Sequence, residues 1–284
     1  MRWYGWLGVA VIVGAEALLF GGQPVVGRWF TPIVWTGYVL LVDARLVRRT
    51  GRSYLTTDRA ELVLVVIASI AGWWLFEWYD APRFWRGGAD RVGLWWQYHE
   101  LEPDPWLRRI GYDWSFATIF PALFLTAALL RPRFARLRVP PWRPSPGLLR
   151  GAVALGVVCV VLPLLVVSTW LVPLVWTGFV LLLEPINYRR GRPSWLAALA
   201  RGDASLVLAL LAAGGVCGVL WEFWNYWAVT RWTYTVPYLG TIKVFEMPVL
   251  GYLGFPPFAL ECYAMYHWLA GGLGAAGPAR DPVL

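Results

Sequence analysis

Five acidic side chains fall inside long apolar stretches of the chain, where a carboxylate is costly to place and therefore suggests function. They are Glu16, Glu77, Glu184, Glu222 and Glu261. Glu77 and Glu222 are each followed three residues later by a second polar side chain, Asp80 in one case and Asn225 in the other. A spacing of three places both side chains on one helix face. If Glu77 and Glu222 meet, burial keeps at least one of them protonated, and a neutral carboxylic acid in an apolar pocket is a proton donor.

Aromatic residues surround both acids. We expect Glu222 or Glu77 to donate a proton, Asp80 and Asn225 to orient the donor, and aromatic faces to stabilise a developing cation. The side chains predicted to bind the substrate are Trp74, Trp78, Trp221, Trp224 and Tyr263. A structural role is the alternative, because tryptophan is enriched at membrane interfaces and a glutamate near a helix end reaches water.

The remaining candidates carry weaker signals. Glu261 lies near the middle of its apolar stretch, so we expect it to be neutral or paired and include it among the candidate catalytic residues. Glu184 lies close to Arg189 and Arg190, which predicts a structural ion pair. The positions of Glu261, His99 and His267 do not fit a metal site. We also find no glycine-rich phosphate loop, so we predict neither a metal nor a cofactor.

The composition is typical of a multi-pass membrane protein. Of 284 residues, 58% are hydrophobic and only 15% are charged, and the mean hydropathy is +0.53. The net charge of +8 does not indicate nucleic-acid binding, because the basic residues cluster between apolar stretches, where they orient helices. There are only three cysteines, which excludes a disulfide scaffold, and they are too far apart along the chain for a metal site built on cysteine.

We predict an all-α integral membrane protein of about eight spans, each of about 20 residues. The expected spans are 3–22, 29–47, 61–79, 114–131, 151–169, 171–187, 204–226 and 252–272. A tight hairpin near Pro173 separates the fifth and sixth of them. The outer loop 81–113 is rich in tryptophan and arginine, and we expect it to lie on the membrane surface.

An internal repeat is the strongest pattern in the chain. Residues 32–55 and 173–196 align without a gap and share 12 of 24 positions, including the motif W-T-G-[YF]. The repeat continues through the two acidic positions. We therefore predict two parallel four-helix repeats, 1–140 and 141–284, around a pseudo-two-fold axis along the membrane normal, with a shared site near that axis. This axis would bring Glu77 and Glu222 face to face.

The basic loops predict the orientation. Seventeen of the 25 basic residues lie on one side of the predicted bundle, the side on which both termini also lie. The excess of arginine places those ends, and both termini, on the cytoplasmic side of the cell inner (plasma) membrane. The expected partner is a membrane lipid or a lipophilic substrate.

The second half resembles the membrane-embedded lycopene cyclase domain of carotenoid synthesis. The resemblance rests on Trp221-Glu222, Arg231-Trp232-Thr233-Tyr234, Leu239-Gly240 and Met247-Pro248, and it covers about 45 residues. The family's Pro-x-Glu-Glu is missing after Pro248. As a whole, the chain is more similar to a bacterial multi-pass membrane family with a W-T-G-[YF] repeat. The cyclase resemblance implies proton-initiated isoprenoid chemistry without a cofactor, with Glu222 as the acidic residue.

Three functions stay open from the sequence. The leading hypothesis is a membrane-embedded enzyme that acts on a lipophilic substrate, for example an isoprenoid, by proton donation from a carboxylic acid. The second is a transporter or binding protein for a cationic or lipid-like solute, which the same acids and tryptophans would suit. The third is a non-catalytic scaffold whose tryptophan-rich outer face binds a lipid or a protein.

Overall fold

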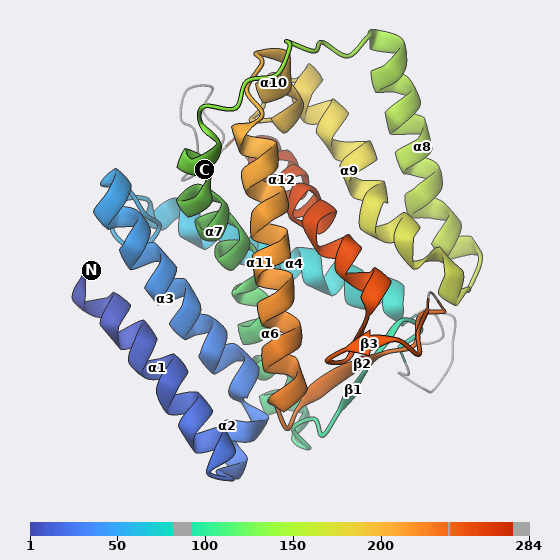
Figure 1. The fold of residues 1–284 in the computed structure, drawn as a ribbon. Helices are drawn as coiled ribbons and strands as arrows, with labels where there is room; N and C mark the ends of the chain where they lie inside the picture. Colours follow the sequence, from blue (N-terminus) through green and yellow to red (C-terminus); the bar gives the residue numbers. More distant parts are fainter. Residues whose placement is uncertain (82–92, 238, 275–284) are drawn as a thin grey trace.

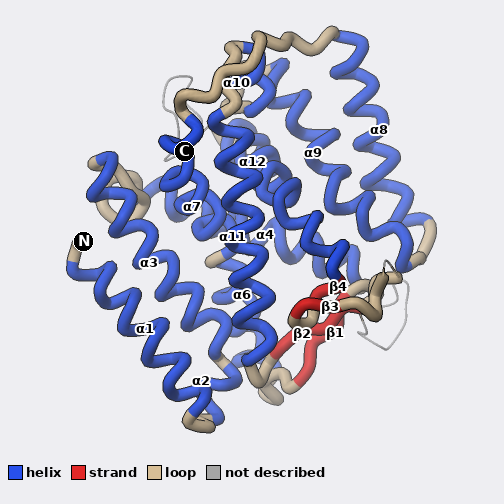
Figure 2. Tube along the Cα trace, viewed as in Figure 1, coloured by secondary structure: helices blue, strands red, loops and turns tan. Residues whose placement is uncertain are grey.

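The structure, a computed structural model, describes residues 1–81, 93–237 and 239–274. In these residues the chain is almost entirely helical, with four short strands gathered at one end of the helical bundle (Figure 2). The helices are α1 (Trp3–Phe20), α2 (Pro24–Arg28), α3 (Phe30–Thr50), α4 (Arg59–Asp80), α6 (Pro105–Ala117), α7 (Ile119–Phe134), α8 (Pro146–Leu165), η1 (Thr169–Leu171), α9 (Val172–Arg189), α10 (Trp195–Ala200), α11 (Ser205–Trp227), η2 (Val249–Gly254) and α12 (Phe255–Gly272). The strands are β1 (Trp96–His99), β2 (Arg231–Tyr234), β3 (Lys243–Val244) and β4 (Met247–Pro248).

Among the described residues, seven helices are long and apolar enough to cross a membrane, as expected for a multi-pass membrane protein. They are α1, α3, α4, α6 continued into α7, α8, η1 continued into α9, and α11. The eighth predicted span corresponds to α12, which has 18 residues and packs against α9, α11 and α4. Helix α12 is less apolar because it carries Glu261 and His267, both of which are buried inside the bundle.

The predicted surface loop 81–113 is only partly a loop. Residues 82–92 lie outside the described residues, 96–99 form β1, and α6 begins at Pro105 rather than near 114. The early start has a local cause, because Asp104 accepts hydrogen bonds from the backbone amides of Trp106 and Leu107 (2.8 and 2.9 Å). An aspartate at this position followed by proline is a strong signal for the start of a helix.

The helices run between two ends of the molecule (Figure 1). The ends of α3, α7 and α9 lie with α10 toward one end, and α2 lies with the strands toward the other. The arginine-rich connections 135–145 and 190–194 therefore lie at the end opposite the strands.

Glycines allow two helix pairs to approach closely. A Cβ added at Gly37, in the first W-T-G motif, would lie 2.9 Å from the carbonyl oxygen of Gly8 on α1. A Cβ at Gly178, in the second motif, would lie 2.9 Å from Val160 Cγ2 on α8. The repeated glycine thus permits the α1–α3 contact in one half and the α8–α9 contact in the other.

Strands β1 and β2 come from opposite halves of the sequence and pair antiparallel. The register places Trp96 opposite Tyr234 and Tyr98 opposite Trp232, with Gln97 opposite Thr233 at the centre. Each strand thus contributes a Trp-x-Tyr sequence, and the two sequences face each other in a reciprocal manner. This two-stranded ribbon joins the halves at one end of the bundle.

Candidate functional site

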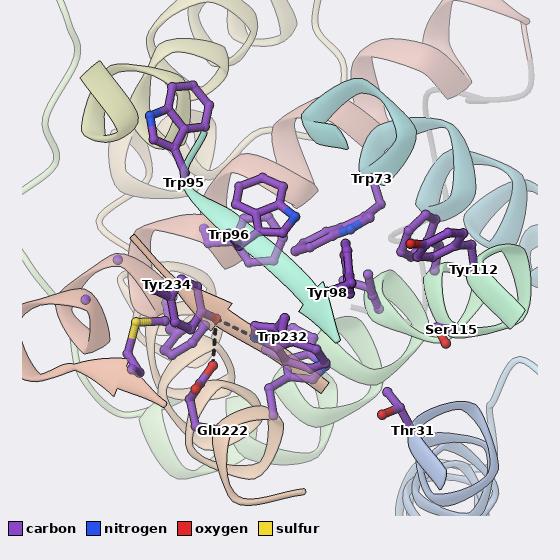
Figure 3. A pocket seen from close by; sticks show the side chains of 18 of the residues that line it. Thr31, Trp73, Trp95, Trp96, Tyr98, Tyr112, Ser115, Glu222, Trp232 and Tyr234 are labelled. Atoms are coloured by element: carbon purple, nitrogen blue, oxygen red, sulfur yellow. Dashed lines mark hydrogen bonds between the residues drawn. The ribbon is translucent and has the colours of Figure 1, made fainter. Parts of the chain in front are cut away.

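A cavity of about 480 Å³ lies between the two halves, beneath the β1–β2 ribbon (Figure 3). Helices α3, α6, α9, α11 and α12 contribute to its wall together with the ribbon. Most of the wall is apolar, and it includes eight tryptophan side chains, those of Trp29, Trp35, Trp73, Trp95, Trp96, Trp176, Trp221 and Trp232. A cavity of this size and composition is typical of a small-molecule site.

The strongest part of the repeat lines this cavity twice. Thr31, Pro32 and Trp35 contribute to the wall from α3, and Val172, Pro173 and Trp176 contribute the aligned positions from α9. Trp35 packs against Trp221 at a ring distance of 5.2 Å. Trp176 stacks on Phe76, which aligns with Trp221, also at 5.2 Å. Corresponding residues of the two halves thus make corresponding contacts across the middle of the molecule.

Glu222 is the one acid of the predicted pair that reaches the cavity wall. Its side chain is fully buried on α11, and its Oε1 accepts a hydrogen bond from the Tyr234 hydroxyl at 2.7 Å. That hydroxyl in turn accepts one from Trp232 Nε1 at 2.7 Å (Figure 3). Glu222 Oε2 is buried and has no hydrogen-bond partner among the described residues. One carboxyl oxygen is therefore fixed by the ribbon and the other is unused.

Glu77 has a different environment on α4. Its Oε1 accepts three hydrogen bonds, from the Tyr98 hydroxyl (2.6 Å), Trp73 Nε1 (2.9 Å) and Trp96 Nε1 (3.2 Å). Those three donors, and not the carboxyl group, line the cavity. The structure places Glu77 behind a layer of aromatic rings, where it holds them in position.

Among the described residues, Glu77 and Glu222 do not form the expected face-to-face pair. Each glutamate bonds to the tyrosine of the strand from its own half, Glu77 to Tyr98 and Glu222 to Tyr234. The two strands lie between the two sites and pair with each other. Each half thus contains one carboxyl–tyrosine contact, and the ribbon joins the two contacts. The carboxyl groups themselves do not touch.

Asp80 and Asn225 have a role that differs from the predicted one. Asp80 Oδ1 accepts hydrogen bonds from the amides of Trp95 (2.6 Å) and Trp96 (3.3 Å). Asn225 accepts one from the Trp232 amide and donates one to the Trp232 carbonyl oxygen, both at 2.8 Å. Both side chains hold the backbone of a strand. They orient the acids only indirectly, through the tyrosine that each strand carries.

The ribbon tyrosines remain hydrogen-bond donors over a wide pH range. Burial raises the pKa of Tyr98 well above the usual value for a phenol, and the neighbouring Glu77 adds to the shift. Burial likewise raises the pKa of Tyr234, to which Glu222 contributes. Because each phenol keeps its proton, each can donate to the carboxyl group beside it.

The other predicted site residues lie away from the cavity wall. Trp74 donates to Asp113 at 2.6 Å, Trp78 is exposed, and Trp224 donates to Glu16 at 3.0 Å. Tyr263 packs against His267 at a ring distance of 4.2 Å. Trp221 is the predicted substrate-binding residue that does line the cavity.

Glu261 is fully buried between α12 and α9, outside the cavity wall. Its Oε1 accepts a hydrogen bond from the Phe179 amide at 3.2 Å, and Oε2 has no partner among the described residues. Its position links two helices of the second half and does not place it beside Glu222.

Glu184 forms hydrogen bonds instead of the predicted ion pair. Its Oε1 accepts from the Ser194 hydroxyl and from the Leu196 amide, at 2.5 and 2.9 Å. The aligned residue Asp43 accepts from the Leu55 amide at 3.2 Å. Each acid therefore fastens the connection after its helix, which explains why both halves keep an acid here.

Sequence reasoning missed most of the residues that form the site. Tyr98 and Tyr234 were not predicted as partners of the acids, although a Trp-x-Tyr sequence follows each acid, at 96–98 after Glu77 and at 232–234 after Glu222. Trp35 and Trp176 were not predicted to bind a substrate, although they are the tryptophans of the repeated motif. Three charged residues at the cavity, Arg28, Glu102 and Arg108, carried no sequence signal.

Comparison with known proteins adds no functional assignment: no family model, no curated protein and no solved structure matches the chain. The chemistry of the site must therefore be argued from its geometry.

Proposed function

We propose that the protein is a membrane-embedded enzyme that binds a lipophilic substrate in the aromatic cavity and protonates it from Glu222. The observation that supports this most directly is the state of the Glu222 carboxyl group. It is fully buried in the wall of a cavity lined by indoles, with one oxygen held by Tyr234 and the other without a partner. A carboxyl group buried without a cation is more stable as the neutral acid.

The chemistry requires no group beyond this chain and its substrate. The O–H bond of the Glu222 carboxyl breaks while a C–H bond forms at a carbon–carbon double bond of the substrate, which leaves a carbocation. The faces of Trp35, Trp176 and Trp221 would stabilise that cation. Loss of a proton from a neighbouring carbon to the Glu222 carboxylate restores the acid. The net reaction is an isomerisation or a cyclisation, as expected for an isoprenoid.

The proposed reaction assigns the two acids different roles. Glu222 is the catalytic residue because its carboxyl group lines the cavity. Glu77 is a positioning residue, because three donors occupy its Oε1 and those donors form part of the cavity wall. In this proposal the acid of the first half is structural and the acid of the second half is catalytic.

We further propose eight membrane crossings, the eighth being α12, in two parallel repeats of four with both termini on the cytoplasmic side of the inner membrane. Corresponding contacts support the repeats: α1 packs on α3 as α8 packs on α9, and α7 packs on α11 as α12 packs on α4. The arginine-rich connections lie at the end opposite the ribbon, which supports the orientation. The cavity then opens toward the outer side.

The test compares Glu222→Gln with the wild-type protein purified in mild detergent. Mass spectrometry of the co-purified lipids identifies the ligand, and the same ligand is then incubated with each protein. We expect the variant to bind the ligand without converting it, while its unfolding midpoint stays near the wild-type value. Conversion at the wild-type rate would remove Glu222 from the mechanism.

A transporter or binding protein for a cationic solute is the second candidate. The observation that favours it is the combination of the buried Glu222 carboxyl group with eight indole rings, which also suits a quaternary ammonium ion. Co-purification of a small cation, together with uptake that a proton gradient drives and Glu222→Gln abolishes, would support this function over catalysis.

A further inference from the structure

The cavity has one charged end, and that end points to the class of ligand. Of the residues that line the cavity, four carry ionisable charge: Glu222 and a group formed by Arg28, Glu102 and Arg108. We call this group the basic mouth. Arg28 ends α2, and Arg108 lies in the first turn of α6.

The positive charge of the basic mouth is only partly compensated. Arg28 Nη1 lies 3.3 Å from Glu102 Oε2, in a single contact that leaves Arg28 Nε buried and without a hydrogen-bond partner among the described residues. Arg108 is held by two carbonyl oxygens, those of Glu102 (2.7 Å) and Pro103 (2.9 Å). Carbonyl oxygens fix the guanidinium group but do not neutralise it. Two cations and one anion therefore leave a net positive charge.

The wall of the cavity continues from the basic mouth along α6. Leu107, Gly111 and Ser115 recur at helical spacing and all line the cavity, and Ile119 on α7 extends the same wall. The distance along the helix from Arg108 to Ile119 is about 16 Å at 1.5 Å per residue. This length accommodates an extended hydrocarbon chain whose charged end stays at the mouth.

The outer face of α6 indicates that the mouth lies at the membrane surface. Trp106, Ile110 and Trp114 recur every four residues and are exposed on the side of α6 that does not line the cavity. Trp106, at the start of the helix, is 81% exposed. Tryptophan at this position is typical of the boundary between lipid tails and headgroups. At this boundary the basic mouth would lie at the depth of the lipid headgroups.

We propose that the ligand is an anionic amphiphile, a phosphate or pyrophosphate ester of a long hydrocarbon chain, with its phosphate held by Arg28 and Arg108 and its chain in the aromatic cavity. Guanidinium groups bind phosphate oxygens through paired, charge-assisted hydrogen bonds. The proposal rests on the proposed function, since it names the substrate class of the same cavity. It places the reacting double bonds in the chain, away from the phosphate.

The experiment uses three probes that share one chain and differ only in the headgroup: 11-bromoundecyl phosphate, 11-bromoundecanol and 11-bromoundecyl trimethylammonium. Bromine quenches indole fluorescence on contact, so saturable quenching of the full-length protein in phosphatidylcholine nanodiscs reports entry into the cavity. We expect the phosphate to reach half-saturation at a concentration about tenfold below that of the alcohol. Inorganic phosphate alone should not displace it.

Neighbouring arginines provide a matched control. Arg28→Gln and Arg108→Gln should each remove the preference for the phosphate probe, whereas Arg109→Gln should keep it, because Arg109 pairs with Asp113 outside the cavity. Glu102→Gln removes the competing anion and should strengthen phosphate binding. Thermal unfolding of each variant shows that the fold is retained.

The outcomes separate this inference from the proposed function. Equal half-saturation for the phosphate and the alcohol overturns the anionic ligand but leaves an apolar ligand in the cavity. Tighter binding of the ammonium probe, or displacement by inorganic phosphate, also overturns it. If none of the probes quenches in a saturable manner, the cavity does not take a hydrocarbon chain and both proposals fail.

Discussion

Replacing Glu77 by alanine should cost more stability than replacing Glu222, whereas replacing Glu222 should cost more activity. Glu77→Ala leaves three hydrogen-bond donors without their acceptor, those of Trp73, Trp96 and Tyr98. Glu222→Ala leaves one, the Tyr234 hydroxyl. Each lost bond costs about 1 kcal/mol, and more where water cannot replace the acceptor. The cavity created by truncating a glutamate is similar in both variants, so its cost largely cancels in the comparison.

We therefore expect Glu77→Ala to lower the free energy of unfolding by about 2 kcal/mol more than Glu222→Ala does. Unfolding of both variants in the same detergent, followed by tryptophan fluorescence against denaturant, measures the difference. Conversion of the co-purified ligand should show the reverse order, with Glu222→Ala inactive and Glu77→Ala partly active. Equal losses of stability, or an inactive Glu77→Ala protein of wild-type stability, would contradict the division of roles between the acids.

Two further predictions concern the packing of the helices and the protonation of the ribbon. Gly37→Ala and Gly178→Ala should each destabilise the protein by about 1–3 kcal/mol, because the added methyl group overlaps the neighbouring helix. Gly215→Ala should stabilise it by about 0.5–1 kcal/mol, since nothing lies within 4 Å of the added Cβ and alanine favours the helix; denaturant unfolding of the three variants checks the opposite signs. Because the pKa values of Tyr98 and Tyr234 are raised on folding, the stability that these phenols contribute is present below pH 10 and is lost as the pH rises further. In a titration followed at 295 nm, the phenolate absorbance that develops near pH 10 should be the same in Tyr98→Phe and Tyr234→Phe as in the wild-type protein. A smaller absorbance in either variant would mean that the replaced phenol ionises normally.

The sequence allowed the apolar helices to be predicted because span length and composition are local properties. The repeat at 32–55 and 173–196 could be read from the sequence, but only the structure shows that its tryptophans, Trp35 and Trp176, line the cavity from both halves. The depth of Glu261 in its helix led us to expect a neutral or paired side chain; in the structure it is fully buried and accepts a hydrogen bond from the Phe179 amide.

The partners of the acids could not be predicted in this way because they depend on pairing between distant segments. Tyr98 lies 21 residues after Glu77, whereas Tyr234 lies 12 residues after Glu222, so the two connections do not align. Only the register of β1 on β2 shows that the tyrosines are equivalent. The basic mouth depends likewise on the meeting of α2 with the start of α6, which no local pattern specifies.

The spacing of Asp80 after Glu77 and of Asn225 after Glu222 indicated a shared helix face but not what that face contacts. Both side chains bind strand backbone. This contact can be predicted only when the path of the chain from the helix to the strand is known. Within each pair the acid contacts a tyrosine side chain of the ribbon, and its neighbour contacts the strand backbone.

The reciprocal register of β1 and β2 has a consequence for how such a protein could arise. In this register the central residues of the two Trp-x-Tyr sequences lie opposite each other, and each tryptophan lies opposite a tyrosine. A single Trp-x-Tyr strand could therefore make the same contacts with a second copy of itself. A four-helix chain of half this length would therefore close the ribbon by homodimerisation, with one acid–tyrosine contact in each subunit. Fusion of two such genes would free one copy of the acid to remain structural while the other acquired chemistry.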